Sequence, residues 1–469
     1  MLIQFLGGAM EVTGSTHVLS TRKSRVLRDA GLFQGRRAQA REKNETTFVN
    51  MDPVDCMVLS HAHIDHCGNI PLLVKNGFQG PIHTHVATKD LCELMLMDSA
   101  HIQEMDAEYL SRKLDPDDPL IAPLYSEEEA EASLQYFVPH QYHEHIQLTE
   151  DIGVTAYEAG HILGSASHIF DIKEGRRNIK VGYALDLGRK GLPIIRDPEQ
   201  LTDIDALVME ATYGNRRHRD IEQSEDLLAG VITRTYKKGG KIIIPAFALE
   251  RAQEVIYTLM KLYGKTDEKG FPVVPKLPIY IDSPLACEVS RVFGKHSETY
   301  DEKTLELAKS RTKMYMSEFV HLIGSVEESK ALNDDPSSMI IISASGMCES
   351  GRILHHLKNN VEDPRNAVVI VGYQAENTLG RRIVDRAEEI KIFGKMYRMN
   401  AERVVLNTYS GHADSKDLMD FARNVGDRCK TFVLVHGEER SIMDLAANIR
   451  AMRPDARVLT PSRFDIISI

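Results

Sequence analysis

The sequence predicts an α/β protein of two domains, one of them inserted into the other. Short apolar strands near the beginning of the chain are followed by histidine or aspartate. Residues 209–395 instead alternate strands with longer helices, which is typical of a parallel sheet with helices on both faces. Residues 396–469 return to strands followed by histidine. The simplest interpretation is that they complete a first domain that residues 1–208 begin.

Composition narrows the class of protein. A chain of 469 residues has room for about two to four domains. The net charge of −11 argues mildly against a general polyanion binder, although a local basic groove remains compatible with it. Six cysteines without a CxxC pair indicate reduced thiols. The chain shows neither a signal-like start nor a run of about 20 apolar residues, so we expect a cytoplasmic protein without a membrane partner.

The first four expected strands cover residues 2–6, 17–20, 24–28 and 55–60. An apolar residue would fit the end of the third strand better than Arg28 does. The fourth strand leads into the segment His61-Ala62-His63-Ile64-Asp65-His66. Imidazole and carboxylate are ligands that zinc and similar metals prefer. The alternative interpretation is a solvated polar loop.

We expect a helix over residues 65–76 directly after this segment. It would turn Asp65 and His66 away from His61 and His63, so the spacing suggests two neighbouring metal ions. A strand at 81–84 and a helix at 87–105 follow, the latter from its apolar period. A polar segment at 114–131 is read as a loop and an acidic helix. His140, His143 and His145 alternate on an expected edge strand, and we interpret them as structural or surface residues.

Later strands also end in residues that suit a site. A strand from Val154 leads to His161, a strand from Lys180 ends near Asp186, and residues 205–210 end in Glu210. Strands at 403–408 and 431–435 lead to His412 and His436. Binding loops gather at strand ends, so these residues join the first segment as candidates. The strands expected within the inserted domain cover residues 241–245, 278–282, 339–343 and 368–372.

Seven residues are candidate metal ligands: His61, His63, Asp65, His66, His161, Asp186 and His436. Seven ligands with one bridging carboxylate suit two metal ions, each with an open position. No thiolate ligand is evident, which favours a hydrolase over a redox enzyme. Glu210 and His412 remain without a metal role. A carboxylate paired with an imidazole suits a general acid.

Three other features could hold a phosphate. The Ser345-Gly346 turn precedes a helix and could present backbone N–H groups. Basic residues cluster at Arg216-Arg217-His218-Arg219 and at Arg381-Arg382. Such clusters either face solvent or bind the phosphates of a nucleic-acid backbone, and both interpretations stay open.

The histidine-rich segment resembles the HxHxDH signature of the metallo-β-lactamase superfamily. Asp29, His161 and Asp186 fall where further motifs of that superfamily are expected. Three stretches resemble the additional motifs of its β-CASP branch, the nucleic-acid-processing nucleases: Glu210-Ala211-Thr212-Tyr213-Gly214, Ser410-Gly411-His412-Ala413-Asp414 and Val435-His436-Gly437-Glu438. The resemblance covers nearly the whole chain.

The resemblance implies a metallo-β-lactamase αββα sandwich with an inserted α/β β-CASP domain, whose parallel sheet is Rossmann-like. It implies two zinc ions per chain. One would be held by His61, His63 and His161, the other by Asp65, His66 and His436, with Asp186 bridging. The implied catalytic residues are Asp29, Asp65, Glu210 and His412, and the candidate substrate-binding residues are Arg216, Ser345, Gly346, Arg381 and Ser410.

The resemblance further implies hydrolysis of RNA, with single strands favoured, to give 5′-phosphate and 3′-hydroxyl ends. His412, held by Glu210, would protonate the departing 3′ oxygen. We expect an endonuclease, with 5′–3′ exonuclease action as the alternative, and leave a homo-oligomer open. The rival functions are a small-ester hydrolase of the same superfamily and a non-catalytic RNA-binding scaffold.

Overall fold

A computed structural model describes the chain except for residues 50, 114–119, 219–220, 311–316, 373, 375–377 and 407–410. The described chain divides into two units. The first unit comprises residues 1–191, 197–217 and 411–469, and the second comprises residues 192–196 and 218–410. Each unit has its own sheets and its own core.

The first unit contains two seven-stranded sheets. One sheet has the spatial order β22 (Ile466–Ser468), β1 (Leu2–Gly7), β2 (Thr16–Ser20), β3 (Arg25–Arg28), β4 (Cys56–Val58), β5 (Ile82–His85) and β6 (Phe137–His140). The other has the order β21 (Arg457–Leu459), β20 (Thr431–Val435), β11 (Ala206–Glu210), β10 (Arg177–Ala184), β9 (Ala166–Glu174), β8 (Ile152–Glu158) and β7 (His145–Gln147).

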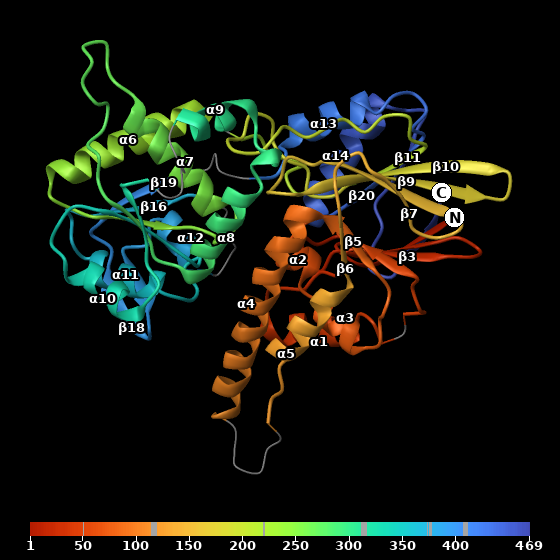
Figure 1. The fold of residues 1–469 in the computed structure, drawn as a ribbon, viewed down its shortest axis with the longest axis horizontal. Coiled ribbons are helices and arrows are strands. Elements are labelled where there is room, and N and C mark those ends of the chain that lie inside the picture. The colour runs from red at the N-terminus through yellow and green to blue at the C-terminus, as the bar shows by residue number, and fades with distance from the viewer. Residues whose placement is uncertain are drawn as a thin grey trace. The chain divides into compact units, whose positions relative to one another are not determined.

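Helices cover the outer face of each sheet (Figure 1). Beside the first sheet lie α1 (Arg37–Thr46), α2 (Ile64–Cys67), α3 (Ile70–Lys75), α4 (Val86–Ser111) and α5 (Glu127–Ser133), followed by η1 (Leu134–Tyr136). Beside the second lie α13 (Ser415–Asn424) and α14 (Glu439–Met452). Among the described helices none is both long and apolar enough to cross a membrane. The four layers confirm the predicted αββα sandwich.

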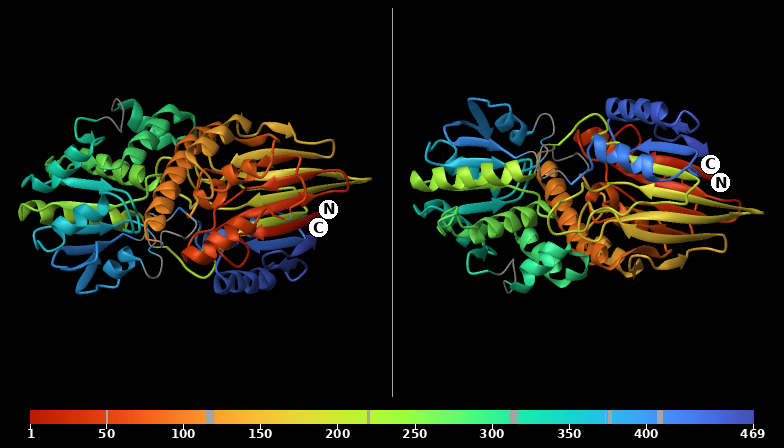
Figure 2. Two further views of the ribbon diagram at one scale, coloured as in Figure 1. Left: turned by 90° about the horizontal axis from the view of Figure 1, so that it is seen from below. Right: turned by 90° about the horizontal axis from the view of Figure 1, so that it is seen from above.

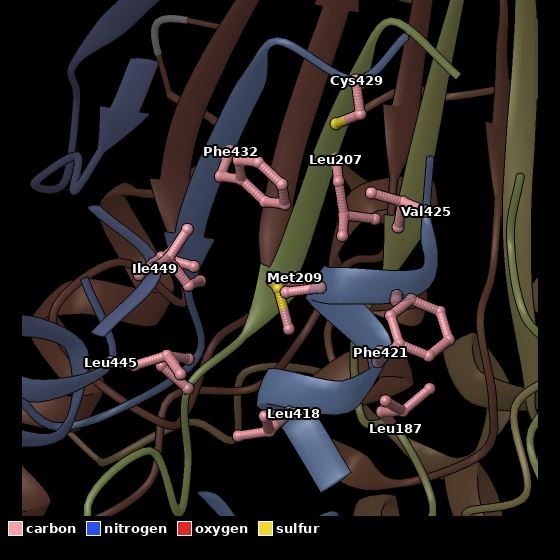
Figure 3. Close-up of a cluster of buried hydrophobic side chains, with 14 of the residues drawn as sticks. Leu187, Leu207, Met209, Leu418, Phe421, Val425, Cys429, Phe432, Leu445 and Ile449 are labelled. Atoms are coloured by element: carbon pink, nitrogen blue, oxygen red, sulfur yellow. The ribbon is translucent and has the colours of Figure 1, made fainter. Parts of the chain in front are cut away.

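Two apolar cores hold these layers together. Figure 3 shows the outer core, where side chains of α13 and α14 meet β11 and β20. Its buried members include Leu207, Met209, Leu418, Phe421, Phe432, Leu445 and Ile449. The inner core lies between the sheets and includes Phe5, Phe170 and Tyr183. Each fully buried side chain of this size contributes about 1.5–3 kcal/mol. The strand ends that carry the candidate ligands are therefore held from both sides.

The region after the histidine segment differs from the expected single helix over 65–76. The chain forms α2 and α3, separated at Gly68 and Asn69. The Asn69 backbone N–H donates to the carbonyl of Ala30, and its side-chain amide donates to the carbonyl of Gly31. These contacts with the residues that follow β3 take the place of helical hydrogen bonds at Asn69. Apolar periodicity alone does not reveal such contacts.

The second unit is built on a six-stranded parallel sheet, as predicted. The strand order is β14 (Val320–Leu322), β13 (Ile279–Ile281), β15 (Ile340–Ser343), β12 (Ile242–Pro245), β16 (Ala367–Ile370) and β19 (Glu402–Val405). Its helices are α6 (Ile221–Lys237), α7 (Arg251–Gly264), α8 (Pro284–Lys295), η2 (Ser297–Thr299), α9 (Glu302–Ser310), α10 (Val326–Asp334), α11 (Ile353–Asn360) and α12 (Leu379–Val384). A hairpin of β17 (Glu389–Ile392) and β18 (Lys395–Arg398) follows. Figure 2 shows helices on both sides of the parallel sheet.

The described part of the strand expected at 403–408 is β19, which belongs to this sheet, and residues 407 and 408 lie outside the described residues. β19 pairs in parallel with β16, from Ala367 opposite Glu402 to Ile370 opposite Val405. The sequence predicts this strand as part of the first domain, with residue 395 as the last residue of the inserted domain. The second unit instead continues to residue 410, because β19 pairs with β16 as one further strand at the edge of the sheet.

A buried polar network joins β13 to two helices of the second unit. The Asp282 carboxylate accepts hydrogen bonds from His356 Nε2 at 2.6 Å, from Arg352 Nη1 at 2.7 Å and from the Ser329 hydroxyl. Asp282 and His356 are fully buried. Burial alone would raise the pKa of Asp282, but the three donors outweigh burial and hold that pKa below its ordinary value.

Candidate metal centre

The histidine segment of the first unit lies between β4 and α2. β4 ends at Val58, and His63 is the residue that precedes the first turn of α2. His61 therefore lies on the loop, whereas Asp65 and His66 lie within the helical turn. This change of backbone direction turns the two pairs of side chains toward different points, as the spacing predicted.

One group of ligand atoms comes from three histidines. His63 Nδ1 lies 3.1 Å from His61 Nε2 and 3.1 Å from His161 Nε2. Asp186 Oδ2 lies 3.3 Å from His61 Nε2 and 3.4 Å from His161 Nε2. His161 is held on the loop after β8 and is almost fully buried. These four residues could hold one metal ion.

A second group lies on the other side of the same aspartate. His66 Nε2 lies 3.1 Å from His436 Nε2 and 3.2 Å from Asp186 Oδ1. Asp65 Oδ2 lies 3.5 Å from His436 Nε2. Asp65, His66, Asp186 and His436 could hold a second ion, so Asp186 is shared by both groups. All seven candidate ligands thus come together in this unit.

The donor atoms fit a cation better than they fit one another. Asp186 Oδ1 and His161 Nδ1 are buried and accept or donate no hydrogen bond among the described residues. Several imidazole nitrogens face each other at 3.1 Å, where lone pairs repel unless a proton or a metal lies between them. Zinc takes such nitrogen and oxygen ligands. Asp186 and His436 also hold the left-handed backbone conformation, with φ of 48° and 46°, a strain that is typical of functional sites.

Protonation differs between the two groups. Burial, and then the charge of His61, lowers the pKa of His63 to about 3. Burial also lowers the pKa of His161 well below its ordinary value. Burial opposes a proton on His66, but the carboxylates of Asp186 and Asp29 raise its pKa well above the ordinary value. The rings of His63 and His161 are therefore neutral and have lone pairs to offer to a metal.

Asp29 orients His66 from behind. Its Oδ2 lies 2.7 Å from His66 Nδ1, which leaves Nε2 directed at Asp186. The Ser60 backbone N–H donates to Asp29 Oδ1 at 2.8 Å, and the Ser60 hydroxyl donates to the same carboxylate. The sequence reading did not single out Ser60, although a hydroxyl residue directly before His61 was the available signal. Metal-binding histidines commonly have such a carboxylate partner.

Arg28 is a fully buried partner of Asp29. Its guanidinium donates from Nη1 to Asp29 Oδ1 and lies 5.9 Å above the Tyr183 ring. Arg28 Nε and Nη2 have no hydrogen-bond partner among the described residues. The same is true of the two ring nitrogens of His17 and of the Tyr183 hydroxyl. The aspartate therefore neutralises a charge that the sandwich interior would otherwise exclude. This explains an arginine where an apolar residue was expected.

Glu210 and His412 form a pair beside the shared aspartate. His412 Nδ1 lies 3.1 Å from Glu210 Oε2, and the His412 ring centroid lies 4.6 Å from that of His161. The Leu187 backbone N–H donates to Glu210 Oε1 at 2.5 Å and fixes the carboxylate. Burial disfavours the protonated ring, but Glu210 and Asp186 outweigh burial and raise the pKa of His412 to about 9. Glu210 holds the ring through Nδ1 and thereby orients Nε2, the opposite nitrogen of His412.

Two glycines allow the backbone segments of the centre to approach. A Cβ atom on Gly31 would lie 1.7 Å from the carbonyl oxygen of Asp65. One on Gly188 would lie 1.7 Å from the carbonyl oxygen of Gly160. Only glycine permits contacts this close. The loops after β3 and β10 are thereby packed against the segments that carry Asp65 and His161.

The candidate substrate residues are divided between the two units. Arg216 is exposed in the first unit, and its carbonyl accepts a hydrogen bond from the backbone of Ser415 at the start of α13. Ser345 and Gly346 lie in the second unit on the loop between β15 and α11. Arg381 lies on α12 and pairs with Asp385 at 2.9 Å. Ser410 is outside the described residues.

The expected edge-strand histidines each have a separate partner. His140 Nε2 lies 2.8 Å from His83 Nδ1, His143 Nε2 lies 2.7 Å from Glu199, and His145 Nδ1 lies 3.2 Å from the Thr155 hydroxyl. His140 and His145 lie on strands of different sheets, not on one strand. These contacts agree with the structural or surface interpretation.

Comparison with known proteins places the fold and the centre in one class. Residues 18–189 match the metallo-β-lactamase superfamily domain, residues 252–383 the Beta-Casp domain, and residues 396–461 the Zn-dependent metallo-hydrolase RNA specificity domain. The αββα unit with its histidine and aspartate centre is thus that of a metal-binding metallo-hydrolase. The chain belongs to the β-CASP family of the metallo-β-lactamase superfamily.

Relatives from two organisms match the sequence of this chain along most of their own length. Ribonuclease TTHA0252 of Thermus thermophilus is 34% identical over 447 residues, which are 95% of each chain. Transcription termination factor FttA of Methanosarcina mazei is 31% identical, over 97% of this chain and 70% of that relative. A solved structure of a protein of unknown function from Enterococcus faecalis covers 100% of this chain with a TM-score of 0.54 and 13% identity, which shows the fold alone.

Proposed function

We propose that this protein is a zinc-dependent ribonuclease that hydrolyses RNA phosphodiester bonds at a centre of two zinc ions. The observation that carries the proposal is the position of Asp186. It is shared by two groups of ligand atoms and also lies beside the Glu210–His412 pair. A centre of this kind, with an acid next to it, suits the displacement of an alkoxide from a phosphodiester. The name of the relative TTHA0252, a ribonuclease, supports RNA as the substrate.

Each ion would have its own set of ligands. His61, His63 and His161 would hold one, and Asp65, His66 and His436 the other, with Asp186 between them. When bound, the two ions would lower the pKa of water toward neutrality and offset the negative charge of the phosphate. The cysteines that the structure describes are not among these ligands, and an all-nitrogen and oxygen set favours hydrolysis over electron transfer.

The residues around the ions have separate tasks. Asp29 holds the ring of His66 so that Nε2 faces the centre, and Arg28 and Ser60 hold Asp29. Glu210 accepts the hydrogen bond of His412 Nδ1, so His412 Nε2 is left to give a proton to the departing 3′ oxygen. The products would be a 5′-phosphate and a 3′-hydroxyl. Proton donation by a positioned group contributes about 10²–10⁴-fold to such reactions.

The family match supports a ribonuclease over the two rival functions. The match to an RNA specificity domain covers residues 396–461, which include His412 and His436. A small ester would need no second unit of this size, and a non-catalytic scaffold would have no need for seven converging ligands. Internal cleavage is favoured, with 5′–3′ exonuclease action as the alternative. We expect the protein to act in RNA processing or decay.

The test is digestion of one RNA labelled at either end, with 5′-phosphate and 5′-triphosphate forms compared. We expect the zinc-loaded protein to produce discrete internal fragments with 5′-phosphate ends. Mononucleotides released first would identify an exonuclease instead. A His63→Ala/His66→Ala variant that folds, as judged by circular dichroism, should lose cleavage. The proposal is wrong if this variant cuts single-stranded RNA as fast as the parent.

A further inference from the structure

One exposed aromatic side chain lies at the carboxyl edge of the parallel sheet in the second unit. Phe247 is the second residue after β12, and its neighbours Ala246, Ala248 and Leu249 are buried. The Phe247 side chain is 37% exposed. Ligands of open α/β sheets bind outside the carboxyl ends of the strands, where the strand order changes direction. β12 lies at such a point, because β13, β14 and β15 lie on one side of it and β16 and β19 on the other.

Two glycines form a floor under the Phe247 ring. A Cβ atom on Gly346, which follows β15, would lie 2.7 Å from Phe247 Cδ2 and 2.9 Å from Cε2 and Cγ. A Cβ atom on Gly372, which follows β16, would lie 3.5 Å from Phe247 Cε2. The ring therefore lies against the bare backbone that follows β15 and β16, the two strands that flank β12. Any side chain at position 346 would push it away.

The floor is itself fixed. The buried Gln374 donates from Nε2 to the carbonyl of Gly346 at 2.9 Å and to that of Gly372 at 3.2 Å. Gly380 leaves room for this amide, because a Cβ atom there would lie 1.6 Å from Gln374 Oε1. A phenyl ring held on such a floor keeps one orientation while part of its surface faces solvent.

A cationic segment borders this floor. The Gly380 backbone N–H donates to the carbonyl of Met347 at 3.0 Å, which ties α12 to the loop that contains Gly346. α12 carries Arg381 and the exposed Arg382. Single-stranded nucleic acids bind where aromatic rings stack on bases and nearby cations contact phosphates. An exposed ring on a rigid floor, with the arginine-bearing α12 tied to the same loop, matches this chemistry.

We propose that Phe247, supported by Gly346 and Gly372, is a stacking platform for one base of single-stranded RNA. The proposal rests on the proposed function for the identity of the ligand, and it assigns the recognition of an unpaired base to the second unit. Gly346 then supports the ring and is not primarily a phosphate ligand. Stacking on a phenyl ring accepts any base, so this platform would favour unpaired strands over particular sequences.

The absence of tryptophan from the sequence makes the platform directly observable. Phe247→Trp would introduce a single indole, whose emission is quenched when a base stacks on it. Zinc-loaded Phe247→Trp is mixed in a stopped-flow instrument with oligoadenylate, and the emission is read before turnover. The controls are an abasic strand of equal length and charge, and the variant Phe271→Trp at another exposed phenylalanine of the same unit.

We expect quenching of Phe247→Trp by oligoadenylate, none by the abasic strand, and none of Phe271→Trp. Phe247→Ala should raise the KM for single-stranded RNA about 5- to 150-fold, the equivalent of 1–3 kcal/mol per stacked base. The slope of KM against salt should stay that of the parent, because no charge is removed. Phe247→Tyr should restore binding.

Two results would overturn the platform. Equal quenching by the abasic strand would mean that phosphates and not bases approach residue 247. A parental KM in Phe247→Ala would mean that the ring is not used. In both cases cleavage by the parent would leave the proposed function standing. A parent that cuts no RNA would overturn the proposed function separately, and the quenching assay would then show whether bases stack at this position at all.

Discussion

Replacing Arg28 by methionine tests how the metal centre is supported from behind. The change keeps an unbranched side chain, shorter than that of arginine, and removes the charge that pairs with Asp29. Both side chains are completely buried, and breaking a buried ion pair costs about 3–5 kcal/mol. Asp29 keeps its hydrogen bonds from His66 and Ser60, and two guanidinium nitrogens have no partner to lose among the described residues. We therefore expect Arg28→Met to lower the free energy of unfolding by about 3 kcal/mol, the lower end of this range.

The matched control lies on the same strand. Arg25 on β3 pairs with Asp52, whose side chain is 76% exposed. Arg25→Met should cost no more than about 1 kcal/mol, because exposed ion pairs contribute little. Urea unfolding of the metal-free protein, followed by circular dichroism, measures the free energy of unfolding of the first unit in both variants. Zinc affinity, measured with a competing chelator, should fall about 10- to 100-fold in Arg28→Met and stay constant in Arg25→Met.

The reasoning would be refuted if Arg28→Met were as stable as the parent and bound zinc equally well. The buried charge would then contribute nothing to the orientation of His66. A double-mutant cycle with Asp29→Asn separates the pair from its surroundings. We expect a coupling energy of about 0.5–3 kcal/mol between the two positions, and a coupling near zero would contradict the pairing.

Three further changes have expected outcomes. His412→Ala should lower kcat for RNA cleavage about 10²–10⁴-fold with zinc content unchanged, measured by single-turnover kinetics and metal analysis. Asp282→Asn should destabilise the second unit at neutral pH by losing charged hydrogen bonds to His356 and its neighbours. Because the pKa of Asp282 is lowered from 3.8, the parent's advantage is present above that pH and should shrink as the pH falls below it in urea titrations. Gly31→Ala should cost about 1–3 kcal/mol through collision with the Asp65 carbonyl, seen in thermal melts.

The candidate ligands could be predicted from the sequence because each is a histidine or aspartate at the end of an apolar strand. Strand ends meet at one edge of a sheet, so residues as distant in sequence as His66 and His436 could be expected to approach. Their distance of 3.1 Å between Nε2 atoms could not, because it depends on loop conformations. The positive φ angles of Asp186 and His436 are part of those conformations. Aspartate and histidine adopt such angles more often than most residues, but the sequence does not show which of them do.

The rest of the fold was harder to predict for identifiable reasons. The break between α2 and α3 arises from the contacts of Asn69 with Ala30 and Gly31, which are distant in sequence. β9 was not expected, although it pairs with both β8 and β10. The role of β19 was misassigned, because a short apolar strand carries no mark of the sheet that it joins. Arg28 departs from the expected apolar residue because the neighbouring Asp29 supplies a compensating charge, which a strand pattern does not reveal.

The central claim is that RNA cleavage depends on two zinc ions held around Asp186. The most direct measurement returns zinc in known amounts to the metal-free protein and records the rate of RNA cleavage at each step. We expect no cleavage without metal and full activity at about two equivalents per chain, with Asp186→Asn inactive throughout. Cleavage at the full rate by the metal-free protein, or by Asp186→Asn, would contradict the claim.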